Sequence, residues 1–213
     1  MKTCNKCGKK DLSWNVSWHQ HSGKWQLINH KNKDGEWCVN NTLKPKENFI
    51  LYHGHLLVSE NVKAALFLID VYKETDYQLV IASNYKNTEV IKEVLKHENI
   101  TFNPLTDEND LNILFENAHI NALPTFQNTG IKLKLLNTLR QGKFIIANDY
   151  MVNETGLETL CEKANTKTEF LSKTAKLFNK DFEVSFVEDR KKLLESFDSK
   201  NNAKKIINLI FKN

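Results

Sequence analysis

From residue 49 onward, short apolar runs alternate with segments in which apolar residues recur at helical spacing. The apolar runs are FILYH (49–53), YQLVIA (77–82), 100–102, 120–123 and FIIA (144–147). They lack the polar alternation of half-exposed strands, which is typical of strands buried on both faces of a parallel sheet. Helical spacing is found at 60–73, 88–97, 107–118, 130–141, 170–178, 190–197 and 203–211.

This alternation predicts βαβ units and therefore an α/β fold, a Rossmann-like parallel sheet with flanking helices. Ligands of such sheets bind beyond the carboxyl ends of the strands. That rule selects three polar loops, at 54–59, 125–130 and 148–156. We expect Ser59 to cap the helix after the first loop, and Gly142 to end the helix at 130–141 as a C-terminal glycine.

The first 46 residues follow a different pattern. They hold all four Trp and three of the four Cys, and the segments 15–21 and 24–29 flank a Ser-Gly pair, which predicts a β-hairpin. We therefore expect a small β module at 1–46 and the Rossmann-like domain at 47–213. The module has a net charge of +6 and the domain one of −2. Nucleic acid is a candidate partner for such a basic module, and a solvated lysine-rich surface is the alternative.

The cysteines of this module suggest a structural zinc site. Cys4 and Cys7 form a CxxC pair, and Cys38 supplies a third thiol, a pattern similar to a zinc ribbon. The fourth ligand is open among three histidines, His19, His21 and His30. We favour His30, which lies near the end of the second hairpin strand. An unmetallated tail is the alternative, although so short a module rarely folds without a metal or a disulfide. No catalytic metal is predicted.

A second candidate site is the start of the helix at 130–141. This helix follows a polar loop and begins Gly-Ile-Lys-Leu-Lys, so free backbone N–H groups and two lysines, Lys132 and Lys134, favour an anion there. Residues two apart do not share a helix face, so one of the two lysines is expected to point into the cleft. The alternative is that both lysines are solvated.

Three stretches of the chain resemble the donor-binding half of GT-B glycosyltransferases, in particular the family-4-like group. They are LPTFQNTGIKLKLLNTLRQGKFIIAN at 123–148, the strand, loop and helix at 52–65, and MVNETGLETLC at 151–161. The resemblance extends over 49–213 with the order of strands and helices kept. It implies that this domain binds a nucleotide-diphosphate sugar and, if active, transfers a hexosyl group.

The resemblance also implies roles for individual residues. The loop with Gly54 and His55 would approach the diphosphate, and Lys134 would reach the phosphates. Asn137 stands where an acid usually holds the ribose hydroxyls, and the corner at Thr129 and Gly130 would lie close to the donor. The chain departs from the pattern because Thr129 and Asn137 replace two glutamates, and Glu-Asn at 60–61 replaces Lys-Gly.

Complete GT-B enzymes have a second Rossmann-like domain that binds the acceptor, and residues 1–48 are too few to form it. Either an acceptor-domain partner chain supplies the missing half, or the chain is a truncated or degenerate relative of these enzymes. The alternative is a non-catalytic scaffold, in which the zinc module recruits a protein or nucleic acid and the Rossmann-like half is relict.

The hydrophobic pattern predicts no transmembrane segment. A membrane helix needs about 20 apolar residues, and no run in this chain approaches that length. The N-terminus has no apolar stretch behind its lysines and therefore does not resemble a signal peptide. We expect a cytoplasmic protein.

Overall fold

The computed structural model describes residues 15–19, 24–31, 37–39, 48–127, 132–183 and 185–211. The chain divides into two compact units, Met1–Lys44 and Pro45–Asn213. In the first unit the description covers the backbone of three strands, β1 (Asn15–His19), β2 (Lys24–Lys31) and β3 (Trp37–Val39), which form an antiparallel sheet. The hairpin predicted from the sequence is confirmed as β1 and β2.

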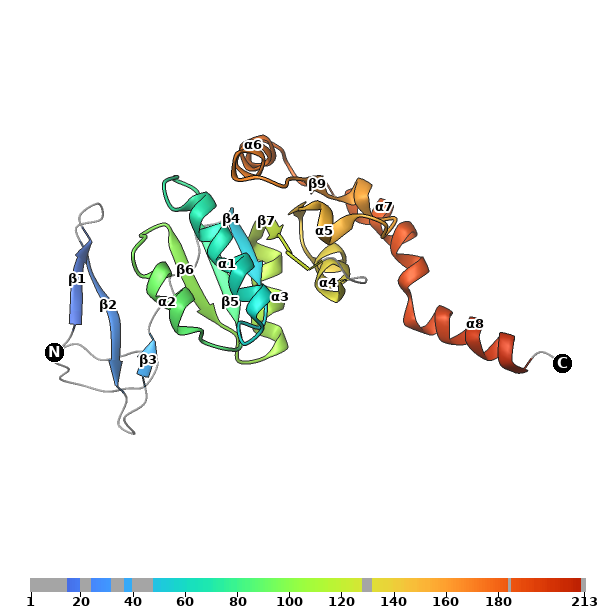
Figure 1. Ribbon diagram of the computed structural model, residues 1–213, viewed down its shortest axis with the longest axis horizontal. Coiled ribbons are helices and arrows are strands. Elements are labelled where there is room, and N and C mark those ends of the chain that lie inside the picture. Colours follow the sequence, from blue (N-terminus) through green and yellow to red (C-terminus); the bar gives the residue numbers. More distant parts are fainter. Residues whose placement is uncertain are drawn as a thin grey trace. The chain divides into compact units, whose positions relative to one another are not determined.

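The second unit contains a six-stranded sheet in which every pairing is parallel. Its strands are β4 (Phe49–His53), β5 (Leu79–Ser83), β6 (Ile100–Pro104), β7 (Ala118–Leu123), β8 (Phe144–Ala147) and β9 (Glu162–Lys163). Their order is β6-β5-β4-β7-β8-β9 (Figure 1). Chain order therefore reverses between β4 and β7, as in a doubly wound fold. The predicted fold class is confirmed, although β9 was not expected.

Helices cover both faces of this sheet (Figure 1). They are α1 (Ser59–Tyr72), α2 (Thr88–Val94), α3 (Glu108–Asn117), α4 (Leu133–Gln141), α5 (Asp149–Val152), α6 (Lys167–Phe178), α7 (Ser185–Leu194) and α8 (Ser199–Phe211), with short 3-10 turns η1 (Glu158–Leu160) and η2 (Glu195–Phe197). One core contains side chains of α1, α2 and α6. On the opposite face, α3 packs in a second core, and α4, α5 and α7 in a third.

Several helix ends differ from the sequence prediction: α4 begins at 133 rather than 130, α7 spans 185–194 rather than 190–197, and α8 begins at 199 rather than 203. Ser59 is the first residue of α1 rather than its cap, and the cap position is taken by Val58 without a side-chain hydrogen bond. The helix expected from residue 170 begins earlier, at Lys167, because Thr166 and Glu169 form a capping box. The side chain of Thr166 accepts a hydrogen bond from the N–H of Glu169, and the side chain of Glu169 accepts one from the N–H of Thr166. The spacing of apolar residues, on which the prediction rested, does not reveal such a cap.

Glycine is needed at residue 142, where α4 ends, because a side chain would not fit there. Its backbone conformation does not require glycine. Its φ is −81°, which any residue can adopt. A Cβ at this position would lie 2.5 Å from Nδ2 of Asn121, a fully buried side chain on β7. The glycine therefore lets the end of α4 approach Asn121 of β7 closely.

Arg190 holds the other side of this helix end. Its buried guanidinium group donates a hydrogen bond of 2.6 Å to the carbonyl of Gly142 and a second to the carbonyl of Lys143. These carbonyls follow the last turn of α4, where backbone acceptors have no intrahelical donor. Arg190 thus joins α7 to the α4–β8 connection.

Replacement of Arg190 by Met should lower the free energy of unfolding by about 2–3 kcal/mol, because buried carbonyls lose charged donors. Urea unfolding followed by circular dichroism measures the change. Arg140→Met is the matched control, since Arg140 is exposed and its bond to the carbonyl of Phe197 is long, at 3.4 Å. Equal stability of the two variants would contradict the structural role given to Arg190.

Candidate functional site

The reversal of strand order places the candidate site between the carboxyl ends of β4 and β7. Parallel pairing sets Ile50 opposite Ile120 and Leu51 opposite Asn121, so both strands end at the same edge. The loop after β4 leads into α1, and the loop after β7 leads into α4. Ligands of open α/β sheets bind in the crevice that such a reversal leaves.

Lys134, in the first turn of α4, reaches across this crevice to the β4–α1 connection. Its Nζ lies 2.9 Å from Oδ1 of Asn61 and 3.4 Å from the hydroxyl of Tyr52. The ammonium group also lies 4.6 Å from the centroid of the Tyr52 ring, within the range of a cation–π contact. Three elements, α4, β4 and α1, therefore converge on this one cation.

The environment of Lys134 is neutral rather than acidic. Among the residues that the structure describes, no carboxylate forms an ion pair with it. Burial lowers the pKa of Lys134 from 10.5 to about 8. Burial also raises the pKa of Tyr52, so its hydroxyl stays protonated and donates to the carbonyl of Asn61 at 3.0 Å. A half-buried ammonium group with only neutral partners favours an added anion.

Gly54 leaves room for this arrangement. A Cβ on Gly54 would lie 2.9 Å from Nζ of Lys134 and 3.1 Å from the Tyr52 hydroxyl. Most backbone donors of this loop have partners within the protein: the N–H of Gly54 bonds to the carbonyl of Ala82, and that of Leu56 to Oγ of Ser83. The loop therefore contributes space for a ligand more than backbone donors.

His53, the last residue of β4, connects the strand to α4. Its Nε2 lies 3.0 Å from Oγ1 of Thr138, and that hydroxyl also donates to the carbonyl of Lys134 at 2.9 Å. Burial, followed by the charge of Lys134, lowers the pKa of His53 to about 3. The imidazole is therefore neutral across the physiological range and acts as a positioning group under the helix that carries Lys134.

His55 points to the other side of the crevice. Its Nδ1 lies 2.7 Å from Oδ1 of Asn84, in the loop after β5. A cavity of about 390 Å³ opens here at the carboxyl ends of β4, β5 and β6. Its lining consists of His53, Gly54, His55, Ser83, Asn84, Leu105, Thr106, Asp107 and Leu111. Gly54 thus lies between this cavity and Lys134.

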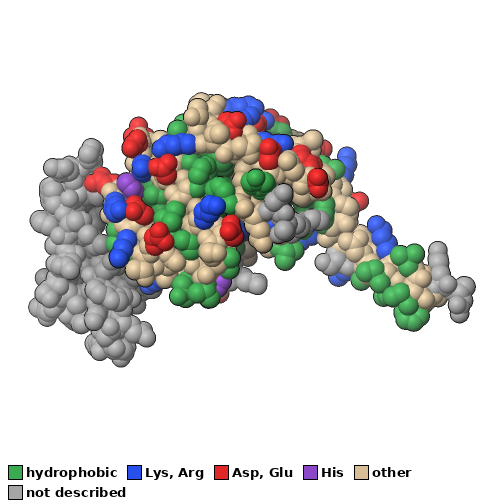
Figure 2. Space-filling model, in the orientation of Figure 1, with side chains coloured by type: hydrophobic (Ala, Val, Ile, Leu, Met, Phe, Trp, Pro, Cys, Tyr) green, Lys and Arg blue, Asp and Glu red, His purple; other side chains and the backbone are tan. Residues whose placement is uncertain are grey.

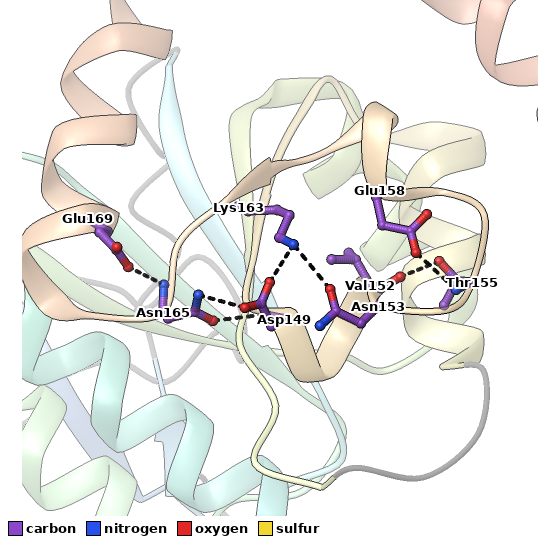
Figure 3. A network of polar contacts seen from close by, with 8 residues as sticks. All are labelled: Asp149, Val152, Asn153, Thr155, Glu158, Lys163, Asn165 and Glu169. Carbon is purple, nitrogen blue, oxygen red and sulfur yellow. Dashed lines mark hydrogen bonds and ion pairs between the residues drawn. The ribbon is translucent and has the colours of Figure 1, made fainter.

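The loop after β8, the third loop selected from the sequence, is held by a polar network (Figure 3). Asp149 forms a 2.6 Å ion pair with Lys163 of β9 and accepts a hydrogen bond from Asn165 at 3.0 Å. Lys163 also donates to Asn153 at 3.1 Å. These contacts join the loop to β9 and to the segment just before α6.

Asn148 links this loop to the one after β7. Its Oδ1 accepts a hydrogen bond from the N–H of Thr125 at 3.0 Å, and its Nδ2 donates to the carbonyl of Thr125 at 2.6 Å. A second cavity of about 510 Å³ lies beside this pair, lined by Phe126, Asn148, Asp149, Tyr150, Asn153, Glu154 and Asn165. Two separate cavities therefore lie at the sheet edge, one at β4 to β6 and one at the loops after β7 and β8.

The structure brings together two of the predicted donor-binding residues, Gly54 and Lys134. His55 lies at the neighbouring cavity. Asn137 is exposed one turn further along α4, and its side chain makes no hydrogen bond to any described residue. Thr129 and Gly130 lie outside the described residues. Sequence reasoning assigned no role to Tyr52 and Asn61, because no spacing rule relates residue 134 to either.

Two of the four predicted zinc ligands lie outside the described residues. Cys4 and Cys7 are not among the described residues, whereas His30 on β2 and Cys38 on β3 are opposite each other in register. Within the described ranges, no group of three or more His, Cys, Asp or Glu residues could hold a metal ion. Within the same ranges, no helix is both long enough and apolar enough to cross a membrane.

No protein-family profile and no curated protein sequence matches the chain. Solved structures do match. An α,α-trehalose-phosphate synthase (UDP-forming) from Burkholderia vietnamiensis superposes with a TM-score of 0.57 and 8% identity, over 72% of this chain and 41% of that one. The N-terminal domain of trehalose-6-phosphate phosphatase from Candida albicans gives a TM-score of 0.53 and 11% identity, over 70% of this chain and 38% of that one.

AviGT4, a glycosyltransferase involved in avilamycin A biosynthesis, gives a TM-score of 0.50 and 13% identity, over 70% of this chain and 47% of that one. At these identities the likeness concerns the fold alone. The second unit therefore has a GT-B glycosyltransferase-like fold. The chain spans less than half the length of each of these three structures.

The lowered pKa of Lys134 predicts a distinct pH dependence of stability. Between pH about 8 and 10.5 the unfolded chain binds more protons than the folded one at this residue, so its contribution to stability rises with pH. Wild type should therefore gain about 2–3 kcal/mol relative to Lys134→Met across this range. Urea unfolding at several pH values measures the difference, with the exposed Lys92→Met as control. Parallel curves for wild type and Lys134→Met would contradict the burial of this ammonium group.

Proposed function

We propose that residues 47–213 bind a nucleotide-diphosphate sugar at the carboxyl edge of the sheet and act as the donor half of a glycosyltransferase. The observation that carries this proposal is Lys134, a half-buried ammonium group whose described partners are all neutral. A diphosphate supplies the negative charge that this environment lacks. The GT-B-like fold supports the same proposal, because this crevice is where sheets of this type bind ligands.

In the proposed reaction, the bond between the sugar and the diphosphate breaks and negative charge grows on the leaving diphosphate. The Lys134 ammonium group, oriented by Asn61 and Tyr52, stabilises that charge at a position from which water is largely excluded. His53, at the end of β4, and Thr138 hold the first turn of α4 in position through their hydrogen bonds. Gly54 and His55 line the crevice that holds the donor, and Asn137 of α4 contacts the ribose hydroxyls. Thr129 and Gly130 complete the donor site.

Transfer also requires an acceptor, and we propose that a partner chain provides the acceptor domain. The chain spans 41% of the matched synthase, so a comparable enzyme needs further structure. Large apolar side chains are exposed along the same edge as the proposed donor site. They are Leu57 (63%), Tyr85 (41%), Leu133 (75%) and Tyr150 (53%). Each lies in or beside a loop after a strand, so a domain that closes over the donor would cover them.

The donor site is tested by thermal shift and calorimetric titration with UDP, GDP, ADP and their common sugar conjugates. UDP is the first probe, because the matched synthase is named as UDP-forming. Lys134→Met should lower the affinity for the nucleotide that binds by about 10- to 100-fold, since a charged hydrogen bond to phosphate is lost. Lys92→Met should leave the affinity unchanged. Affinity should also fall as the pH rises above about 8, where free Lys134 loses its proton.

A second variant separates positioning from charge. Gly54→Ala keeps every charged group but places a methyl group against Nζ of Lys134, so it should weaken nucleotide binding with little loss of stability. If none of the nucleotides tested binds, the donor proposal is wrong. The relict scaffold, with its protein- or nucleic-acid-binding zinc module, would then be the better description.

For residues 1–46 we propose a structural zinc ion held by Cys4, Cys7, His30 and Cys38. The register that pairs His30 with Cys38 supports this set, because facing residues on antiparallel strands have Cβ atoms about 5 Å apart. The proposal predicts one zinc per chain by elemental analysis of purified protein. Cys7→Ser should reduce the metal content by at least half. His19→Ala, which changes a histidine outside the set, should retain it, and equal loss in both would contradict the assignment.

A further inference from the structure

The last helix, α8, separates apolar and basic side chains onto two faces. Successive helical residues are about 100° apart, so the apolar side chains occupy a sector of roughly 200°, which also contains Lys200 and Asn202 of the first turn. They are Ala203, Ile206, Ile207, Leu209, Ile210 and Phe211. Lys204 and Lys205 lie on the opposite side with asparagines, and α8 contains no acidic residue.

Among the described residues, the side-chain hydrogen bonds of α8 lie in its first turn and go to residues 196 and 198, directly before the helix. The N–H of Asn201 bonds to Oδ1 of Asp198 at 2.8 Å, and Nδ2 of Asn202 donates to the carbonyl of Ser196 at 3.0 Å. Beyond this turn the apolar side chains face solvent, with Leu209 81% and Phe211 76% exposed. Figure 2 shows hydrophobic side chains covering much of the visible surface of the segment that Figure 1 labels α8. The domain's own core therefore does not use this face.

We propose that α8 is an interfacial helix that docks the domain onto an anionic lipid surface. In this arrangement Ile206, Ile210 and Phe211 enter the boundary between headgroups and acyl chains. Lys204 and Lys205 remain at the headgroups, where each lysine near an anionic leaflet strengthens binding about fivefold. A wide apolar face beside a polar face whose charges are all lysines is the pattern of helices that lie in the membrane interface.

The charge of α8 favours an anionic lipid surface over a second copy of the chain as the partner of this helix. The domain as a whole has a net charge of −2, yet α8 carries three lysines and no acid, so its charge is opposite to that of the body behind it. In a two-fold pair of α8 helices, the lysines that flank the apolar face would meet one another. An anionic lipid surface instead complements the lysines and covers the apolar side chains together. This inference does not depend on the donor-site proposal.

The test is co-sedimentation of the full chain with vesicles of phosphatidylcholine alone, or with about a third phosphatidylglycerol. Wild type should bind the anionic vesicles, and binding should weaken as salt rises. The N-terminal module is also basic, so variants of α8 decide the origin of the binding. Lys204→Gln with Lys205→Gln should lower partitioning about 25-fold. Lys86→Gln with Lys92→Gln, both on the exposed surface of the domain, should leave it unchanged.

Ile206→Asp with Ile210→Asp removes the apolar face while keeping the lysines, and should lower partitioning at least 100-fold. Both side chains are exposed, so the unfolding transition of the domain should not change. Equal binding to neutral vesicles, or unaltered binding by either α8 variant, would overturn the proposal. So would a solution dimer that Ile206→Asp with Ile210→Asp dissociates while vesicle binding persists, because α8 would then be a contact between chains.

Discussion

The parallel pairing of β4 with β7 is the contact on which the candidate site depends. These strands are distant in sequence, and the two loops that follow them meet only because both strands end at the same edge. The first loop leads into α1, which carries Asn61, and the second into α4, which carries Lys134. The close approach of α4 at Gly142 and the bonds from Arg190 then fix the helix against the sheet. The position of one ammonium group thus follows from the topology of the whole sheet.

Lys134 shows how such a site departs from what stability alone would favour. Burial of an ammonium group costs free energy, and a carboxylate nearby would offset much of that cost. The described surroundings offer an amide oxygen, a phenol and an aromatic ring instead. These neutral partners orient the ammonium group without neutralising its charge. A ligand that brings negative charge therefore gains more here than at a paired lysine, and part of its binding free energy comes from relief of this unfavourable burial.

In the described part of the domain, two groups of exposed apolar side chains bear on its proposed partners. One lies along the carboxyl edge, in Leu57, Tyr85, Leu133 and Tyr150, and the other on α8. The first group surrounds the proposed donor site and consists of uncharged side chains. This composition suits contact with a protein domain that closes over the site. The second combines a wider apolar face with lysines, which suits a lipid surface. Under the two proposals, the carboxyl edge would bind a partner domain and α8 a lipid surface, and each proposal is tested on its own.

The sequence by itself determined the class of fold. Unbroken apolar runs such as 49–53 and 144–147 are typical of strands buried on both faces, and their alternation with segments of helical spacing indicates a parallel sheet. It also singled out the loops after β4, β7 and β8, and the pair Lys132 and Lys134, between which only the family resemblance chose Lys134. These properties are local, because they depend on periodicity and on residue types within a few positions.

Only the tertiary structure decided what surrounds Lys134, why Gly142 is needed and which surfaces remain open. The contacts of residue 134 with residues 52 and 61 join segments separated by more than 70 positions, and no local pattern encodes such a distance. Gly142 reads as an ordinary helix-ending glycine, yet the space it leaves for Asn121 exists only once α4 packs on β7. The apolar face of α8 likewise reads as a core helix until the packing shows that the core is complete without it, because burial is a property of neighbours rather than of sequence.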